Sequence, residues 1–324
     1  MSYIIFNDKH IDLNKGQTVL SALLDNGFKI PNSCRAGACQ SCLMQSVEGS
    51  VPETSQQGLK DTLKAQGYFL ACSCVPTTPL QIALADTSSL RIKASVVGHD
   101  LLAKDVLRLR LKPEQAFDYR AGQYLSINQN NSIARSYSLA SVNKLDNYLE
   151  FHIRRIDQGK VSSWLHEELQ TGRELEIGQA TGDCFYVPGA ADQKIILAGT
   201  GTGLAPLIGI ARDAIHQGHS GEIHLLHGAI KKDGLYMHQQ LITMTNEYPN
   251  FHYHASVLQA DEVKLPVRTD AIDKIVTDIA INAADWKAYL CGDESTVNTL
   301  KKKLFLAGTS MGNIYTDPFI TTMD

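Results

Sequence analysis

Three cysteines near the start of the chain limit what its first segment can fold into. Cys34, Cys39 and Cys42 have the spacing C-x4-C-x2-C, and Cys72 follows after 29 intervening residues. Residues 36–38, Ala-Gly-Ala, are small, so backbone N–H groups can approach the sulfur atoms. The seven cysteines are odd in number and unevenly spaced, which favours metal binding over disulfides in a reducing compartment. The pattern predicts a loop that wraps an inorganic centre held by four thiolates.

The spacing is that of plant-type [2Fe-2S] ligation. A zinc site usually has two C-x2-C pairs, whereas the second pair here is Cys72-Ser73-Cys74. We predict a [2Fe-2S] cluster, with zinc and metal-free structural cysteines as the alternatives. Cys72 and Cys74 compete to be the fourth ligand. We choose Cys72, because residues 67–72, GYFLAC, resemble the end of the ferredoxin cluster loop.

The flanking pattern agrees with a small mixed domain. Residues 3–6 and 10–13 indicate a hairpin, and residues 19–26 have the apolar period of a helix that Thr18 caps. Residues 80–84 indicate a late strand. This order resembles the β-grasp fold of plant-type ferredoxins over residues 1–86.

Composition excludes several classes of partner. A chain of 324 residues is long enough for two or three domains, and its net charge of −4 provides no basic surface for nucleic acid or an anionic membrane. The first ten residues lack the pattern of a secretory signal, and the longest uncharged run, 195–211, is too short and too interrupted to span a bilayer. We expect a cytoplasmic protein with no membrane segment.

A polar linker at residues 86–89 separates the first domain from a β-rich middle. Residues 91–97, 106–111 and 148–153 alternate apolar and polar side chains with period two, which predicts an antiparallel sheet or barrel. We assign residues 89–189 to this second domain.

The middle domain contains the sequence Arg135-Ser136-Tyr137-Ser138, which can hold a flavin. Arg135 would pair with a phosphate, Tyr137 would lie against the ring system, and Ser138 would bond near the flavin N5. Taken alone, four such residues are more often a solvated strand edge. The turn at Gly159, which opens a helix, adds N-terminal amides for a pyrophosphate.

These features resemble the ferredoxin-NADP reductase superfamily, in which an RxYS motif, a Gly/Ser helix start and a later glycine turn bind FAD. The turn at residues 178–185 departs from the usual Gly-Pro-x-Gly, because Gln179 and Ala180 replace common residues, so FMN stays an alternative. The resemblance implies flavin contacts at the RxYS motif and at His152, Gly159, Val161, Ser162 and Gly182.

A parallel sheet is expected over residues 190–324, because strand-like and helix-like segments alternate there. Residues 194–198 form an apolar run, a glycine-rich turn follows it, and residues 207–217 have a helical pattern. Such a turn brings backbone N–H groups to a pyrophosphate, although tight turns also need glycine for structure alone. The candidate nucleotide contacts are Gly199, Thr200, Gly201, Thr202, Gly203 and Pro206.

Two later segments resemble motifs of the same reductases. The strand end at Cys291-Gly292-Asp293 would lie at the carboxyl edge of the sheet beside the nicotinamide, and a buried structural thiol is the alternative for Cys291. Residues 314–319 resemble the C-terminal strand, and Phe319 would pack beside the flavin ring unless it is an ordinary core aromatic. We name Ser138, Cys291 and Phe319 as the catalytic candidates.

The nucleotide is predicted to be NADH. A 2′-phosphate would favour Arg or Lys after the strand that ends at Gly228, and only Lys231 and Lys232 stand there, so NADPH stays possible. His224 and His227 lie three apart on one strand and point to opposite faces, and no histidine lies in a catalytic arrangement.

The order of the three motif sets resembles, over nearly the whole chain, the reductase components of bacterial ring-hydroxylating dioxygenases and related multicomponent monooxygenases, which implies a part in aromatic hydrocarbon catabolism. The resemblance implies a relay in which NADH reduces FAD and single electrons pass to the cluster and on to a terminal oxygenase or ferredoxin. A reductase for a deoxysugar dehydratase and a non-enzymatic redox sensor are the alternatives.

Overall fold

The computed structural model describes residues 2–32, 34–37, 40–59, 61–85, 91–130, 133–259 and 267–319. Cys39, a predicted cluster ligand, and the predicted linker at residues 86–89 lie outside these ranges. The chain forms two compact units. One comprises Met1–Ala94, Tyr124–Ser136 and Glu174–Thr181, and the other Ser95–Gln123, Tyr137–Arg173 and Gly182–Asp324.

A five-stranded mixed sheet occupies the N-terminal segment, in the order β2-β1-β5-β3-β4. Asn7 and Asp8 have positive φ angles of 49° and 61°, the backbone that a tight two-residue hairpin turn needs, and both residue types tolerate it. The predicted hairpin and late strand are confirmed. The strands are β1 Tyr3–Phe6, β2 Lys9–Asp12, β3 Leu43–Glu48, β4 Tyr68–Leu70 and β5 Leu80–Leu84.

The helices of this segment are α1 Val19–Asp25 and α2 Asp61–Ala65, with the short 3-10 helix η1 Glu53–Gln56. Thr18 caps α1, since its hydroxyl accepts a hydrogen bond from the Ser21 N–H at 3.2 Å. Leu20 and Leu23 are buried in the core beneath the sheet. The sheet and this helix confirm the β-grasp prediction.

A six-stranded sheet follows, in the order β10-β7-β6-β11-β8-β9. Its side chains alternate as predicted: Leu107, Leu109 and Leu111 are buried, while Arg108 and Arg110 reach the Asp100 carboxylate at 2.6 and 2.9 Å. The elements are β6 Ile92–Ala103, β7 Val106–Pro113, β8 Tyr124–Asn130, β9 Ile133–Ser138, β10 Leu149–Arg154, β11 Glu174–Ile177 and α3 Lys160–Glu167.

The two ends of this strand order meet. Leu139, just after β9, forms an antiparallel bridge with Phe151 of β10, and the Ala140 N–H donates to the Glu150 carbonyl at 2.9 Å. The sheet is therefore closed as a barrel at this point.

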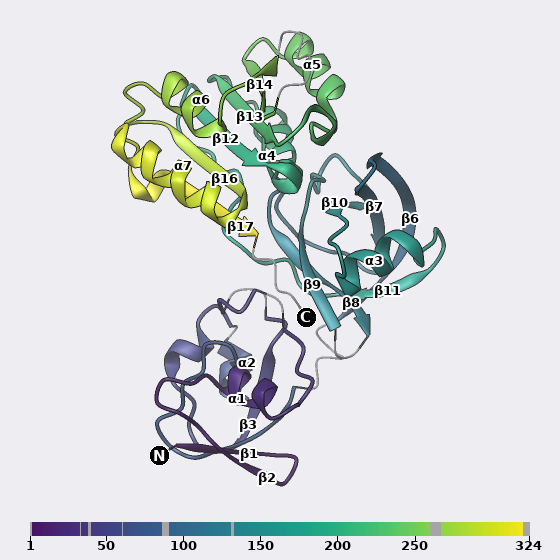
Figure 1. Cartoon of the computed structure of the whole chain (residues 1–324), viewed down its shortest axis with the longest axis vertical. Coiled ribbons are helices and arrows are strands. Elements are labelled where there is room, and N and C mark those ends of the chain that lie inside the picture. The colour runs from purple at the N-terminus through teal and green to yellow at the C-terminus, as the bar shows by residue number, and fades with distance from the viewer. Residues whose placement is uncertain are drawn as a thin grey trace. The chain divides into compact units, whose positions relative to one another are not determined.

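The C-terminal segment is a six-stranded parallel sheet in the order β15-β14-β13-β12-β16-β17. Helices α4 and α5 cover one face and α6 and α7 the other (Figure 1). The elements are β12 Ile195–Thr200, η3 Gly201–Gly203, α4 Leu204–His216, β13 Ile223–Ala229, η4 Lys232–Gly234, α5 His238–Glu247, β14 Phe251–Val257, β15 Val267–Arg268, α6 Ile272–Ile279, β16 Lys287–Asp293, α7 Glu294–Leu306, η5 Met311–Asn313 and β17 Ile314–Phe319.

The doubly wound prediction is confirmed, with one shift in a helix boundary. Helix α4 begins at Leu204, earlier than the expected Leu207, because Pro206 fits the first turn, where a backbone N–H has no helical partner.

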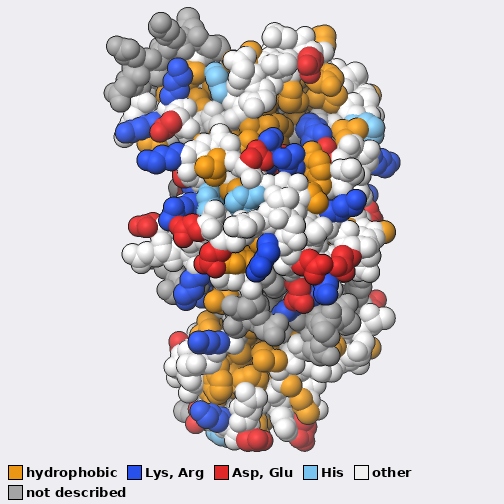
Figure 2. Space-filling view, turned by 90° about the vertical axis from the view of Figure 1, so that its right-hand side faces the viewer, with side chains coloured by type: hydrophobic (Ala, Val, Ile, Leu, Met, Phe, Trp, Pro, Cys, Tyr) orange, Lys and Arg blue, Asp and Glu red, His pale blue; other side chains and the backbone are white. Residues whose placement is uncertain are grey.

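The surface carries charges of both signs. On the face shown in Figure 2, cationic and anionic side chains of the described residues are interspersed. None of the helices in the described ranges is long and apolar enough to cross a lipid bilayer.

Candidate functional site

The structure places three of the four predicted cluster ligands. Cys34 lies in the loop before β3, Cys42 is buried at the end of that loop, and Cys72 follows β4. The Gly37 N–H donates to the Cys72 sulfur at 3.2 Å, which brings Cys72 against the loop from 35 residues away. Gly37 has a φ of 75°, so the loop depends on glycine at this turn. An amide aimed at a cysteine sulfur fits a bound thiolate cluster.

Cys74 lies in a different environment from Cys72. Its side chain is fully buried in the N-terminal core, and burial raises the pKa of its thiol to about 12. Its backbone carbonyl accepts the first amide of α1, from Val19, at 2.8 Å. A thiol held in an apolar core suits packing, and the observed geometry supports Cys72 as the fourth ligand.

The predicted flavin residues lie on β9 and at the start of α3. Arg135, Ser136 and Tyr137 are half-buried on β9, and Ser138 is buried at its end. Gly159 is the N-cap of α3, where a Cβ would stand 2.6 Å from the Ser162 hydroxyl oxygen.

Ser162 and Val161 are buried in the first turn of α3. The Ser162 hydroxyl already accepts the Ile156 N–H at 3.1 Å, so it shapes the turn. Gly182 has a φ of 100°, and its carbonyl accepts the Gln123 side-chain amide at 3.0 Å. The turn thus keeps its glycine geometry despite Gln179 and Ala180.

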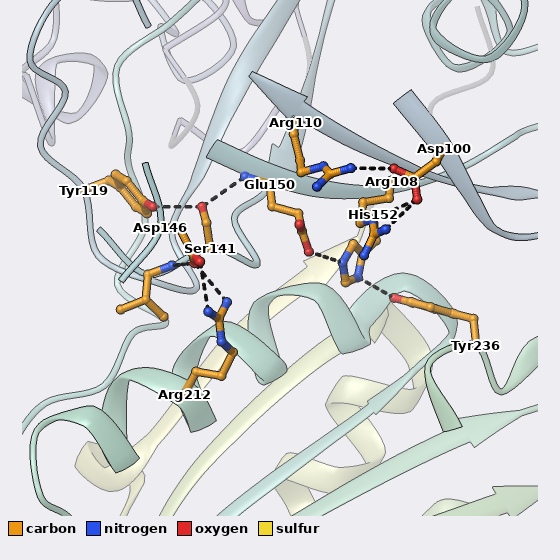
Figure 3. A network of polar contacts seen from close by, with 11 residues as sticks. Asp100, Arg108, Arg110, Tyr119, Ser141, Asp146, Glu150, His152, Arg212 and Tyr236 are labelled. Atoms are coloured by element: carbon orange, nitrogen blue, oxygen red, sulfur yellow. Dashed lines mark hydrogen bonds and ion pairs between the residues drawn. The ribbon is translucent and has the colours of Figure 1, made fainter. Parts of the chain in front are cut away.

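Both ring nitrogens of His152 are engaged inside the protein. Nε2 lies 3.1 Å from a Glu150 carboxylate oxygen and Nδ1 lies 3.2 Å from the Tyr236 hydroxyl (Figure 3). The side chain is fully buried, so any flavin contact of His152 would be by packing of the ring.

The glycine-rich turn lies where the strand order of the parallel sheet reverses. From β12 the chain continues to β13, β14 and β15 on one side, and then crosses to β16 and β17 on the other. Ligands of such sheets bind at the carboxyl ends of the strands beside this switch point. Residues 199–203 form the end of β12 and the turn after it, and Cys291 of β16 pairs with Gly199 there.

Close backbone packing explains two glycines of this turn. A Cβ on Gly199 or on Gly203 would stand 2.4 Å from the Cys291 carbonyl oxygen, a distance that real Cβ contacts do not show. Gly292 has a φ of 119°, and a Cβ there would stand 2.8 Å from the Thr200 carbonyl oxygen. The turn and the end of β16 therefore fix each other's position.

We expect Gly203→Ala to lower the unfolding midpoint, because the new Cβ must displace the backbone of residues 291 and 292. The free energy of unfolding should fall by about 2 kcal/mol or more. Gly312→Ala is the matched control, since its Cβ would meet its nearest atom, the Ser310 hydroxyl, at 3.8 Å. Calorimetric unfolding of both variants measures the difference, and equal midpoints would show that the turn is not packed as described.

The Asp293 carboxylate caps helix α7. It accepts the Ser295 hydroxyl at 2.7 Å and the Thr296 N–H at 3.1 Å, and these bonds, the first more than the second, hold the pKa of Asp293 below its ordinary value. Lys231 and Lys232 are exposed after β13. The preference for NADH over NADPH stays a prediction.

A buried polar cluster joins the end of β9 to β17. The Ser138 hydroxyl donates to the Asp317 carboxylate at 2.6 Å, across 179 residues of sequence. Burial raises the pKa of Asp317 to about 6. Cys291 is buried beside them, with its sulfur 3.6 Å from that of Cys184, and Phe319 ends β17 two residues after Asp317.

Asp317 and Arg154 were not among the predicted site residues. Asp317 stood inside the quoted C-terminal strand, but nothing in the pattern indicated Ser138 as its partner. Arg154 lies two residues after His152 on β10, so the two share one face of the strand. Its guanidinium nitrogens would lie 2.9 Å from a Cβ at Gly201, so Arg154 packs directly on the nucleotide turn.

An ion pair links helix α4 to the loop before β10. Two Arg212 nitrogens each lie 2.9 Å from a different oxygen of Asp146, and Asp146 also accepts the Val142 N–H at 2.8 Å (Figure 3). The Asp146 side chain is only 9% exposed. The bidentate geometry holds the loop against the helix.

We expect Arg212→Ala to destabilise this region by about 3 kcal/mol, because it leaves a buried carboxylate without its cation. Lys194→Ala, which breaks the half-exposed pair of Lys194 and Glu222, should cost less than about 1 kcal/mol. Urea unfolding of both variants tests this. If the two variants lost similar amounts of unfolding free energy, the burial of Asp146 would not strengthen its ion pair with Arg212.

Three histidines that lie on neighbouring strands, His224, His252 and His254, contact one another. His224 stacks on His252 with ring centroids 4.9 Å apart, and its Nδ1 lies 3.2 Å from the His254 Nε2. The prediction that His224 and His227 face opposite sides is confirmed, since His224 stacks on Trp286 among the residues under α6 and α7, whereas His227 packs on Tyr236 on the other side.

Three domain families match the chain in order. A 2Fe-2S iron-sulfur cluster binding domain matches residues 5–77, an oxidoreductase FAD-binding domain residues 92–186, and an oxidoreductase NAD-binding domain residues 197–302.

Similar proteins cover nearly the whole chain. The aromatic O-demethylase reductase subunit of Amycolatopsis sp. is 34% identical over 89% of this chain and 90% of its own. The reductase component of the naphthalene 1,2-dioxygenase system of Pseudomonas putida is 28% identical, with 97% and 96% covered. The crystal structure of the Amycolatopsis cytochrome P450 reductase GcoB superposes with a TM-score of 0.69 at 28% identity and covers 98% of this chain and 99% of that one.

Proposed function

Because the chain belongs to the family of oxygenase reductase components that join a 2Fe-2S domain to FAD-binding and NAD-binding domains, we propose that it delivers electrons from NADH to a separate terminal oxygenase or ferredoxin. The chain is an NAD(P)H-dependent flavin and iron-sulfur reductase. Bound FAD would supply a two-electron hydride acceptor and a bound [2Fe-2S] cluster a one-electron carrier, which together would let NADH serve one-electron acceptors.

The contact of Ser138 with Asp317 carries the site assignment. It joins the end of the flavin-domain strand to the last strand of the parallel sheet, beside Cys291 and the nucleotide turn. A nicotinamide bound at the switch point would lie next to this cluster. We assign hydride-transfer roles to Ser138, Cys291 and Phe319, and add Asp317.

Asp317 and Ser138 can hold a proton in either of two arrangements. An ionised Asp317 accepts the Ser138 hydroxyl hydrogen, whereas a protonated Asp317 donates to the Ser138 oxygen and frees that hydroxyl to donate elsewhere. Since the pKa of Asp317 is raised to about 6, both arrangements are accessible near neutral pH.

The remaining residues bind and orient the cofactors. The turn at 199–203 and the α3 N-terminus offer backbone N–H groups to pyrophosphates, and Arg135 and Arg154 supply cations. Cys39 completes the cluster ligands with the three described cysteines. The flavin set is Arg135, Ser136, Tyr137, Ser138, His152, Gly159, Val161, Ser162 and Gly182, and the nucleotide set is Gly199 to Gly203, Pro206, Cys291, Gly292 and Asp293.

The proposed domains are residues 1–86, 89–189 and 190–324, and the proposed compartment is the cytoplasm. A purified ring-hydroxylating oxygenase and its ferredoxin test the partner assignment. The reductase with NADH, without oxygen, should reduce one of them at a rate that depends on both protein concentrations. Rapid reduction of cytochrome c with transfer to neither protein would overturn the assignment and leave the reductase activity standing.

A further inference from the structure

His227 is a fully buried imidazole at the carboxyl end of β13, and its role is not explained by packing alone. Its Nε2 lies 3.1 Å from the carbonyl oxygen of Gly201, the first residue of the turn η3. The Tyr236 ring meets it edge to face, with centroids 5.5 Å apart. The side chain is 0% exposed.

The contact with Gly201 fixes where the proton of His227 lies. Burial lowers the pKa of His227 to about 4, so the ring is neutral near pH 7 and carries one N–H. A carbonyl oxygen only accepts, so the hydrogen is on Nε2. Nδ1 is buried and has no hydrogen-bond partner among the described residues.

An unpaired buried nitrogen is unfavourable, and an apolar side chain of similar size would avoid it. The Tyr236 hydroxyl does not hydrogen-bond to the His227 Nδ1. It lies 3.2 Å from the His152 Nδ1 instead (Figure 3). Among the described residues, the imidazole therefore makes a single polar contact, the one to the nucleotide turn.

Holding the Gly201 carbonyl also orients the next amide. The C=O and N–H of a trans peptide point in opposite directions, so a Gly201 carbonyl directed at His227 sends the Thr202 N–H away from it. The same carbonyl accepts the Leu204 N–H, which closes the turn. With a φ of 55°, Gly201 could adopt other orientations, and His227 selects one of them.

We propose that His227 is a positioning residue that holds the Gly201 carbonyl and so points the Thr202 amide at the pyrophosphate of the bound nicotinamide nucleotide. This inference rests on the proposed function of the turn. It assigns to β13 a part in nucleotide affinity that is separate from any contact with the adenosine or the nicotinamide.

Three substitutions separate positioning from packing. A Gln amide nitrogen can occupy the place of Nε2, an Asn amide nitrogen reaches only the place of Nδ1, and Leu has no donor. His224→Leu is the matched control, since it removes an imidazole from the same strand on the opposite face. Calorimetric titration of the oxidised holoprotein with NAD+, ADP-ribose and AMP measures the binding, and thermal unfolding shows which variants are folded.

His227→Asn and His227→Leu should bind NAD+ and ADP-ribose about tenfold more weakly, because in each variant the Thr202 N–H is no longer held in the direction of the pyrophosphate. The affinity for AMP, which has no pyrophosphate, should fall by less than about threefold in these variants. His227→Gln should stay within about threefold of the wild type for all three ligands, as should His224→Leu. With NADH as substrate, KM should rise while kcat stays within about twofold.

Equal NAD+ affinity in folded His227→Asn or His227→Leu would overturn the proposal. So would an equal loss for AMP, or failure of Gln to restore affinity where Asn fails. If Leu does not fold, the comparison of Gln with Asn decides. A wild type that binds neither NAD+ nor ADP-ribose would instead contradict the proposed function of the turn.

Discussion

Cys72→Ala is expected to abolish the iron-sulfur centre and lower cytochrome c reduction by more than about a hundredfold, since one of four thiolates is lost. NADH-dependent reduction of ferricyanide should persist within about twofold, because the flavin and nucleotide sites are untouched. Iron, sulfide and flavin contents, with rates for both acceptors, provide the measurement.

Cys74→Ala is the matched control, because it removes a sulfur two residues away. Its thiol lies in the N-terminal core, so the substitution should cost about 1 kcal/mol of stability and leave the iron content unchanged. The opposite outcome, with iron kept in Cys72→Ala and lost in Cys74→Ala, would reverse the ligand assignment.

Asp317→Asn is expected to slow flavin reduction by NADH about a hundredfold and to make the protein more stable at alkaline pH. The rate falls because Asn cannot exchange a proton with Ser138. The wild-type rate should change with pH around 6, where Asp317 titrates, and the variant should lack this change. Stopped-flow flavin reduction between pH 5 and about 8 measures both effects.

The sign of the stability effect follows from the direction of the pKa shift. The folded pKa of about 6 lies above the ordinary value of 3.8, so the folded state favours the protonated acid. That stabilisation is complete below pH 3.8 and is lost as the pH rises through 6. Asn mimics the neutral form and should gain up to about 3 kcal/mol near pH 8.

Asp233→Asn is the control for Asp317→Asn, because Asp233 is an exposed carboxyl after β13. It should alter neither the rate nor the pH dependence. Ser138→Ala should also slow flavin reduction, as Asp317→Asn does. An unaltered rate in Asp317→Asn would remove Asp317 from the hydride-transfer site.

Local chemistry made much of the fold predictable. Thr18 and its helix, the hairpin around Asn7 and Asp8, and the alternating Leu107 to Leu111 strand each depend on residues within a few positions of one another. The spacing of Cys34, Cys39 and Cys42 likewise predicts three of the four cluster ligands from residues that lie close together in the sequence. The choice of Cys72 over Cys74 came from the resemblance of residues 67–72 to the ferredoxin cluster loop, and the Gly37 contact, which spans 35 residues, supports it.

The unpredicted parts of the site depend on long-range packing. Asp317 meets Ser138 across 179 residues, and the need for Gly199 and Gly203 comes from the Cys291 carbonyl of another strand. The stacked histidines depend on the register that pairs His224 with His252. A sequence pattern carries no information on which backbone atom will lie opposite a given residue.

Anaerobic titration of the purified protein with NADH, followed by visible and electron-spin spectra, tests the relay most directly. We expect bound flavin, iron and sulfide, bleaching of the flavin, and a paramagnetic iron-sulfur signal that grows as the flavin bleaches. The protein should take up more electron equivalents than a flavin alone can hold. A reduced flavin without any iron-sulfur signal, or zinc in place of iron and sulfide, would contradict the relay.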